Sequence, residues 1–419
     1  MKKTIVIVGT LDTKGDEVDL LRSLIKKRGH HVIVIDTGIL HEPQIQADVS
    51  KNKIALAGGG DIQSLIEKGD ESYAQKIMAA GLKKTISSML KGKKIQGILA
   101  IGGGQGSTIA APTLKSLPLG LPKMLISTKI SQAGVWPYIG AKDVMIVPPV
   151  ADLAGINRLT RQVLNNAAGA MVGMVETPPV KDLNRPLVVL SMNGTVTTCG
   201  LTIKNILESE GYAVLVFHSI GTGGFALEEY VKSYDVQGVI ELAVNEIVND
   251  LTGGLASAGP DRLTAAGKRG IPQVIVPGSA DFINFLGPET IPPRYSGRRI
   301  HSHNPQAFLV RTNEKENTLL GKTIADKLNQ SQGPVVLLWP EKGLSTLDSQ
   351  GKPFRDTKAD EALLEALKTH LNGRTDIIEY DVHINDNDFA QAVVAEFKNL
   401  VADNNVPRTV SIKTDHCVV

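Results

Sequence analysis

Two glycine-rich segments in the first half of this chain carry residue types that bind phosphate groups. The first is GTLDTKG (Gly9–Gly15), in which threonine hydroxyls lie beside the positive charge of Lys14. It follows an apolar run and precedes a helical pattern, and the free N–H groups of a helix N-terminus attract anions. Asp12 could ligate Mg²⁺ or hydrogen-bond a ribose, whereas the alternative is an ordinary capped turn. The residues predicted here to bind a nucleotide are Gly9, Thr10, Asp12, Thr13, Lys14 and Gly15, with Asp12 as the metal ligand.

The second segment, IGGGQGST, again lies between an apolar run and a helical pattern. Its three consecutive glycines let a ligand approach the backbone, and Ser107 stands where a phosphate would meet a helix. Its spacing is neither the Rossmann GxGxxG nor the Walker A loop, and Gly-Lys-Thr at 321–323 is predicted to lie within a helix. Residues after the next apolar run, 127–129, would line the same crevice. The nucleotide-binding residues predicted in this group are Gly102, Gly103, Gly104, Gly106, Ser107, Ser127 and Thr128.

The second half holds candidates for acid–base chemistry. His218 ends an apolar run, where an imidazole suits a general acid or base, although a hydrogen-bonded histidine at a strand end is equally expected. We predict His218 and Glu246 as catalytic residues. Cys199 could be a nucleophile at a helix N-terminus, but a lone cysteine is more often a small buried apolar residue. His301 and His303 have metal-ligand spacing without a visible third ligand, so we expect loop histidines.

The elements that must position these residues alternate between strands and helices. Each half opens with an apolar run that leads into Gly-Thr-x-x-Thr-x-Gly, at Gly9–Gly15 and at Gly194–Gly200, and continues with a helical pattern and a second apolar run. The sequence therefore predicts an α/β protein of two Rossmann-like domains, each a doubly wound parallel sheet, related by internal duplication. Strands are predicted at 5–8, 32–35, 95–101, 123–126, 144–147, 187–190, 214–217, 236–240, 273–276, 335–338 and 377–380.

A domain boundary is predicted just after residue 180, where prolines at 178, 179 and 186 interrupt the pattern. The first domain, 1–180, would bind the nucleotide, and a long helical pattern at 152–174 would end it. The second domain, 185–419, carries an insertion at 281–311 without clear periodicity. Irregular insertions of this length are often functional.

Composition excludes several classes of protein. The 419 residues include 45 basic and 43 acidic side chains and only 4% aromatic residues, so nucleic-acid binding is not expected. Two cysteines, Cys199 and Cys417, indicate no disulfide framework and fit a reducing compartment. No run approaches the roughly 18 apolar residues of a membrane-spanning helix. We expect a cytoplasmic protein that binds a small molecule and neither nucleic acid nor membranes.

Several long motifs resemble one known family. GTLDTKG, GGGQGST, LPLGLPKMLIST, DLAGINRLTRQVLNNAAGAMVGM, VFHSIGTGG, AGPDRLTAAGKRGIPQV and SHNP look like segments of the uncharacterised family typified by the N-terminal domain of the tomato mosaic virus resistance protein, often labelled an ATP-binding domain. The resemblance covers Thr4 to about Leu328. It implies two Rossmann-like subdomains, ATP with Mg²⁺ at the first, and a homo-oligomer such as a dimer.

This chain departs from the family at two places. The family's Gly-Gly-Ser-Gly-Gly-Thr corresponds here to Gly-Gly-Gly-Gln-Gly-Ser at 102–107. Its Thr-Thr-Thr-Glu corresponds to the segment 242–246, Leu-Ala-Val-Asn-Glu, which removes hydroxyls from the second crevice. Activity there would therefore differ from that of the family or be lost.

Three functions fit these residues. The first is an ATP-dependent enzyme, kinase-like or ligase-like, acting on a small anionic metabolite in the cleft between the domains. The second is a nucleotide-gated binding or regulatory protein without turnover. The third, an NAD-type oxidoreductase, is disfavoured because GxGxxG is missing after the first strand, although Asp36 ends the second strand where a ribose-binding acid would lie.

Overall fold

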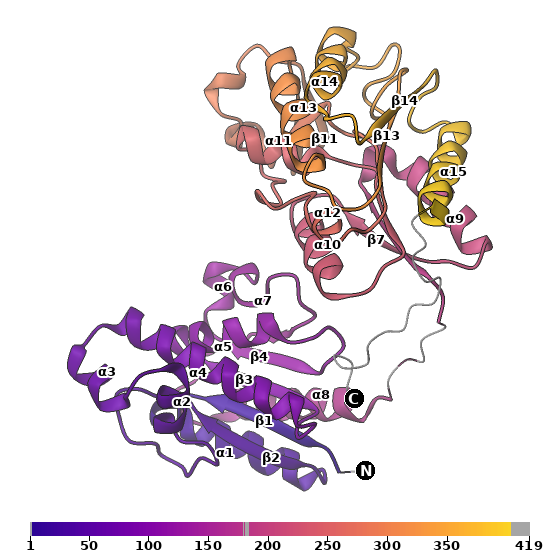
Figure 1. Cartoon of the computed structure of the whole chain (residues 1–419). Helices are drawn as coiled ribbons and strands as arrows, with labels where there is room; N and C mark the ends of the chain where they lie inside the picture. Colours follow the sequence, from indigo (N-terminus) through magenta and orange to yellow (C-terminus); the bar gives the residue numbers. More distant parts are fainter. Residues whose placement is uncertain (1, 179, 181–183, 404–419) are drawn as a thin grey trace. The chain divides into compact units, whose positions relative to one another are not determined.

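The computed structural model describes residues 2–178, 180 and 184–403, and the chain divides into two compact units on either side of 181–183. Each unit is built around its own parallel sheet with helices on both faces (Figure 1). The predicted fold class, two Rossmann-like α/β domains, is confirmed. Pro179 and Cys417 lie outside the described residues. Within those described, no helix has the length and apolar character needed to cross a membrane.

The sheet of the first unit has five parallel strands in the order β2-β1-β3-β4-β5. Its strands are β1 (Thr4–Gly9), β2 (His31–Asp36), β3 (Gly97–Gly102), β4 (Lys123–Ser127) and β5 (Met145–Val147). Its helices are α1 (Leu11–Lys27), α2 (Lys51–Gly58), α3 (Ile62–Lys68), α4 (Glu71–Lys91), α5 (Gly104–Ser116), α6 (Ile130–Ala133), α7 (Trp136–Ile139) and α8 (Arg158–Glu176). The strand order reverses between β1 and β3, and doubly wound sheets bind ligands at the carboxyl ends of strands near such a point.

Strand β1 shows why this sheet is covered on both faces. Its side chains alternate between faces, and both rows are apolar. Ile5 and Ile7 belong to a core formed with α1 and α8, while Val6 and Val8 belong to a core formed with α2, α4 and α5. Because both faces are covered, polar loops are confined to the ends of the strands, and in such sheets the ligand-binding loops lie at the carboxyl ends.

Helix α8 begins later than the sequence predicts. Asn157 caps it, since its Oδ1 accepts hydrogen bonds of 2.9 Å from the N–H groups of Leu159 and Thr160, and the Thr160 hydroxyl accepts one from the Asn157 N–H. This reciprocal capping box fixes the start of the helix at Arg158. The segment 152–157 is therefore a loop that continues from the end of β5.

The sheet of the second unit has six parallel strands in the order β14-β13-β9-β8-β6-β7, the same order extended by one strand. Its strands are β6 (Leu187–Met192), β7 (Ala213–His218), β8 (Gly238–Glu241), β9 (Gln273–Ile275), β13 (Val335–Pro340) and β14 (Asp376–Tyr380). Its helices are α9 (Thr197–Ser209), α10 (Thr222–Ser233), α11 (Asn245–Thr252), α12 (Ala265–Lys268), α13 (Glu314–Leu328), α14 (Thr357–His370) and α15 (Asn387–Asp403). The Gly-Lys-Thr triplet at 321–323 lies within α13, as predicted.

The insertion at 281–311 is more regular than the sequence indicates. It forms an antiparallel sheet in the order β10-β12-β11, from β10 (Phe282–Phe285), β11 (Ile300–Asn304) and β12 (Ala307–Arg311). Phe282 and Leu309 pack together against Phe354 in a small apolar cluster. This packing depends on a residue more than 40 positions away, so the local pattern, interrupted by prolines, does not reveal the strands.

The two repeated Gly-Thr motifs begin at different positions relative to the ends of their strands. Gly9 is the last residue of β1, and α1 begins at Leu11. Gly194 instead starts a short 3₁₀ turn beyond the end of β6, and α9 begins at Thr197. Both motifs therefore follow the first strand of their unit. The first motif includes the end of the strand and the start of a helix, whereas the second begins with a 3₁₀ turn.

Candidate functional site

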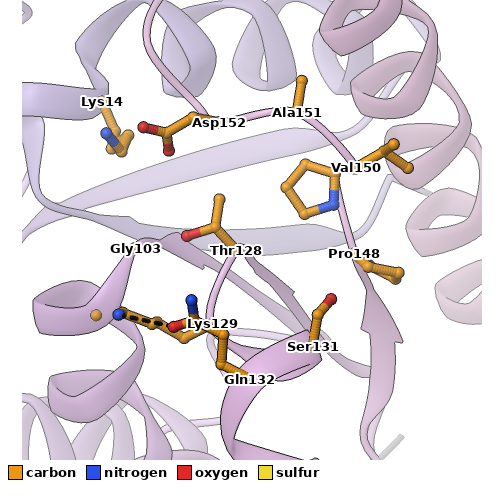
Figure 2. A pocket seen from close by; sticks show the side chains of 12 residues that line it. Lys14, Gly103, Thr128, Lys129, Ser131, Gln132, Pro148, Val150, Ala151 and Asp152 are labelled. Carbon is orange, nitrogen blue, oxygen red and sulfur yellow. Dashed lines mark hydrogen bonds between the residues drawn. The ribbon is translucent and has the colours of Figure 1, made fainter.

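A cavity of about 570 Å³ opens in the first unit at the carboxyl ends of β3, β4 and β5 (Figure 2). Ligand cavities in proteins have volumes of roughly 300–1,000 Å³. Its lining residues are Lys14, Gly103, Gly104, Thr128, Lys129, Ser131, Gln132, Pro148, Pro149, Val150, Ala151 and Asp152. The structure therefore brings one residue of the first glycine-rich segment together with the second segment and with the residues after β4.

The polar side of the cavity suits an anion. Helix α5 starts there, capped by Gly103, and its first turn contains no acidic residue. The first N–H groups of a helix have no intrahelical acceptor, and the helix dipole adds partial positive charge. Lys129 and Lys14 add two full charges, and the Lys129 Nζ donates to Gln132 Oε1 at 3.1 Å. Only one carboxylate, that of Asp152, is among the lining residues.

Four of the glycine-loop residues predicted as ligand contacts serve the scaffold instead of lining the cavity. Ser107 and Ser127 are both fully buried, and their hydroxyl oxygens hydrogen-bond to each other at 2.7 Å. A Cβ atom on Gly102 would lie 2.8 Å from the Gly106 Cα, so the strand end and the helix can approach this closely only without a side chain at 102. These residues hold the loop against the sheet, and Gly103, Gly104 and Thr128 face the cavity.

Several backbone donors of the first segment already have acceptors within the protein. The Leu11 N–H donates to Asp36 Oδ1 at 3.1 Å, and the Gly15 N–H donates to Gln44 Oε1 at 3.1 Å. Thr10 is buried, and its hydroxyl is hydrogen-bonded to that of Thr13 at 3.1 Å. Of this segment, Lys14 reaches the cavity, and a non-helical backbone (φ −126°, ψ 23°) interrupts α1 at that residue.

The two acidic candidates near α1 lie outside the cavity lining. Asp12 packs against Gly38, and its Oδ2 accepts a long hydrogen bond of 3.4 Å from the His41 N–H, while Oδ1 is buried without a hydrogen-bond partner. Asp36 is 1% exposed and accepts from the N–H groups of Leu11 and Gly38. Burial raises the pKa of Asp36, which the two N–H donors partly offset. Its carboxylate organises the start of α1 and is not presented to a ribose.

The segment 148–152 after β5 was not singled out from the sequence as part of a site. Val150 in this loop has φ +68°, a left-handed conformation that β-branched residues rarely adopt, and the residue is 84% exposed. Strained backbone of this kind is concentrated at functional sites. Asp152 follows, with its Oδ1 accepting from the Leu153 N–H at 2.8 Å. The sequence offers one signal for Asp152, an acidic residue shortly after the strand predicted at 144–147. The helical pattern predicted at 152–174 includes this residue and so assigns it to a helix instead of a loop.

In the second unit, Glu246 is fully buried and both of its oxygens are engaged. Oε1 accepts from the N–H groups of Gly221 and Gly224, at 2.6 and 2.9 Å, and Oε2 accepts from Arg262 Nε at 2.7 Å. Arg262 also binds Glu241 and Glu228. Glu246 therefore anchors the glycine-rich start of α10. His218, the other predicted catalytic residue, is exposed at the end of β7.

The carboxyl ends of β6 and β8 are occupied by a bonded polar network. Asn193 Oδ1 accepts from the hydroxyls of Thr195 and Ser279, at 2.9 and 3.0 Å, and Asn193 Nδ2 donates to Asn245 Oδ1 at 3.0 Å. All four residues are buried. Near them, Cys199 is buried in an apolar core, and this burial raises the pKa of its thiol to about 12. A thiolate nucleophile is therefore unfavourable at neutral pH.

The histidine pair lies on a strand and not in a loop. His301 and His303 belong to β11, with ring centroids 6.5 Å apart. No three His, Cys, Asp or Glu side chains within the described parts of the chain are arranged to hold a metal ion.

Comparison with known proteins agrees with the motif resemblance. Two family models match, the N-terminal domain of the uncharacterised protein family UPF0261 over residues 3–179 and its C-terminal domain over residues 185–401. A UPF0261 protein of Clostridium tetani is 39% identical over 96% of this chain and 100% of its own length. The ToMV resistance protein Tm-1(GCR237) of Solanum lycopersicum is 33% identical over 93% of this chain and 55% of its own length.

Among solved structures, an uncharacterized protein from Bacillus cereus ATCC 10987 matches at 10% identity with a TM-score of 0.27, over 79% of this chain and 88% of that one. This likeness is too distant to bear on function. The two family models together cover nearly the whole chain, and two relatives align over 100% and 99% of their own length. The chain therefore belongs to the UPF0261 family.

Proposed function

We propose that the first unit binds a nucleotide, with ATP accompanied by Mg²⁺ as the ligand, and holds its phosphates at the N-terminus of α5. The observation that supports this proposal is that three positively charged groups meet in one cavity: the N-terminus of α5, Lys14 and Lys129. Gly103 and Gly104 open the helix N-terminus toward it, and Lys14 and Lys129 line it. Phosphates bind at helix N-termini because backbone N–H groups and the dipole both favour negative charge.

The rest of the nucleotide would contact the opposite wall. Residues 148–151 are Pro-Pro-Val-Ala, and they give this wall an apolar character. Ligand sites commonly combine such an apolar surface with a few polar groups that fix orientation. Thr128, whose hydroxyl lies between the two lysines in Figure 2, would supply one of these groups.

The biochemical role that best suits this site is ATP-dependent chemistry on a small anionic metabolite, with nucleotide-gated binding without turnover as the alternative. Positioned N–H groups, lysines and Mg²⁺ provide most of the catalysis in phosphoryl transfer. Both oxygens of Glu246 are bonded within the protein, so no acid–base role is proposed for it. His218, exposed at the end of β7, is retained as a candidate acid or base.

We further propose that the protein is a cytoplasmic homodimer and that it binds neither nucleic acid nor membranes. Light scattering of the purified protein tests the dimer directly. A mass near 44.8 kDa, that of one chain, would contradict it.

Isothermal titration of the full chain with ATP and Mg²⁺ tests the site, with NAD as the competing ligand. A Cβ atom on Gly104 would lie 3.2 Å from the Lys129 Cε, so Gly104→Val fills the space in front of that lysine. Gly173→Val, on an open part of α8, is the matched control because nothing lies within 4 Å of its added Cβ. We expect saturable ATP binding that is lost in Gly104→Val and kept in Gly173→Val. No ATP binding by the unmodified protein, or tighter binding of NAD, would overturn the proposal.

A further inference from the structure

We infer that Asp152 is the protein ligand of the Mg²⁺ that accompanies a nucleotide in the first-unit cavity. The inference rests on the proposed nucleotide site and assigns a metal ligand within it. It concerns a residue that the glycine-rich motifs do not contain, and it replaces Asp12 in that role.

The position of Asp152 is the first support. It is the only carboxylate among the residues that line the cavity, and in Figure 2 it points toward Lys14, on the far side of Thr128 from Gly103 and Lys129. Its Oδ1 accepts from the adjacent Leu153 N–H at 2.8 Å, which orients the carboxylate and leaves Oδ2 for a ligand. Neither cavity lysine, both within the described ranges, forms an ion pair with it.

The loop that carries Asp152 is held at both ends. Leu153 is fully buried in the core between α1 and α8, and the capping box at Asn157 fixes the start of α8. On the other side, the left-handed backbone of Val150 turns the chain just before Asp152. A carboxylate placed by a buried neighbour and a sharp turn is suited to a fixed coordination geometry.

The charge of the site gives the second support. The Asp152 carboxylate would repel bound phosphates, and a metal cation between the two groups would turn this repulsion into attraction. Mg²⁺ commonly binds through one or two carboxylates together with phosphate oxygens and water. A single carboxylate beside a phosphate site therefore fits this ion.

The other nearby carboxylates are less suitable. Asp12 packs on Gly38, where a Cβ atom would lie 2.9 Å from the Asp12 Cγ, and its side chain does not line the cavity. Asp36 is buried and holds two backbone N–H groups. Asp152 alone combines a place in the cavity with an oxygen that has no protein donor.

Titration calorimetry of ATP, with and without Mg²⁺, tests the assignment in four forms of the full chain. These are the unmodified protein, Asp152→Asn, Asp12→Asn, and Asp16→Asn as a control that removes an exposed carboxylate from α1. We expect Mg²⁺ to tighten ATP binding about tenfold or more in the unmodified protein and in Asp16→Asn. Asp152→Asn should bind metal-free ATP at least as tightly as the unmodified protein, because repulsion is removed, and should gain nothing from Mg²⁺.

The outcomes separate this inference from the proposed function. If the unmodified protein binds ATP in neither condition, the nucleotide site itself is refuted, and the assignment with it. If ATP binds and Asp152→Asn keeps the full Mg²⁺ effect, only the assignment is wrong. Loss of the effect in Asp12→Asn alone would return the metal to Asp12. Mn²⁺ as a paramagnetic probe gives an independent readout, since its EPR signal with ATP should broaden on binding to the unmodified protein and not to Asp152→Asn.

Discussion

The Ser107 and Ser127 hydroxyls join the two loops that frame the cavity through a buried hydrogen bond of 2.7 Å. Ser107 lies in the first turn of α5, and Ser127 is the last residue of β4. The same Ser127 oxygen accepts from the Lys129 N–H at 3.1 Å. This pair therefore fixes the helix N-terminus relative to the lysine, although neither serine faces the ligand.

Replacement of either serine should destabilise the first unit. Ser107→Ala and Ser127→Ala each leave a buried hydroxyl with a lost partner, which costs about 1–3 kcal/mol. The double variant should lose less free energy of unfolding than the two single variants together, because neither hydroxyl is then left without its partner. Urea unfolding of the three variants measures this coupling. Strict additivity would show that the bond contributes nothing of its own.

The two cavity lysines should contribute separately to nucleotide affinity. We expect Lys14→Ala and Lys129→Ala each to weaken ATP binding by about 1–3 kcal/mol, the scale of a charge-assisted hydrogen bond. Lys26→Ala, which removes an exposed charge near the end of α1, serves as the control. Calorimetric affinities at two salt concentrations would give the answer. Unchanged affinity in either cavity variant would remove that lysine from the site.

A buried acidic cluster in the second unit should make stability depend on pH. Burial raises the pKa of Asp281 to about 6 and that of Asp360 to about 7, against the attraction of Arg311. Burial and the neighbouring Asp281 likewise raise the pKa of Asp348 to about 6. An acid with a raised pKa keeps its proton in the folded state while the unfolded chain has lost it. Stability therefore falls as the pH rises from about 4 to about 7 and levels off above the folded pKa.

Asp281→Asn tests this sign. Asp281 Oδ1 is buried without a partner, so the amide removes a charge that is unfavourable above the folded pKa. The variant should be more stable than the unmodified protein at pH 8 by about 1–3 kcal/mol, with little difference at pH 4. Asp326→Asn, an exposed site on α13, should show no such dependence. Denaturant unfolding at both pH values decides, and an equal effect at both would contradict the ionisation argument.

Cys199 should resist chemical modification in the folded protein. Its thiol is 1% exposed, and burial raises its pKa to about 12, so the reactive thiolate is scarce at pH 8. Treatment with iodoacetamide, followed by mass analysis of the peptide that contains Cys199, should show modification only after denaturation. Rapid alkylation of the native protein would restore the nucleophile hypothesis.

The strands were predictable because both faces of each sheet are buried. Runs such as 124–126 are continuously apolar, and β4 spans Lys123–Ser127. Helix starts were less predictable, since they depend on caps and tertiary contacts. Helix α10 begins at Thr222, inside a motif rich in glycine that suggests a loop, because Glu246 accepts from N–H groups of that turn.

The cavity could be predicted in part. The sequence indicated Lys14, Gly103, Gly104 and Thr128 from residue type and from the rule that ligands gather at the carboxyl ends of strands. It could not show that the Leu11 N–H is taken by Asp36, because that bond joins residues far apart in the chain. It also missed Asp152, since apolar residues such as Leu153 extend the helical pattern across a loop.

Although the two units share a strand order, the chain entropy that is lost when their central strands pair differs between them. The central pairing of β1 with β3 joins Ile5 to Gly97, whereas the equivalent pairing of β6 with β8 joins Val188 to Gly238. The first closes a loop of about 90 residues, since α2, α3 and α4 intervene, and the second closes one of about 50, a difference worth roughly 0.5 kcal/mol in chain entropy. This entropy must be lost before the pairing can stabilise the sheet, so on this basis the second unit should form its central strands first during folding.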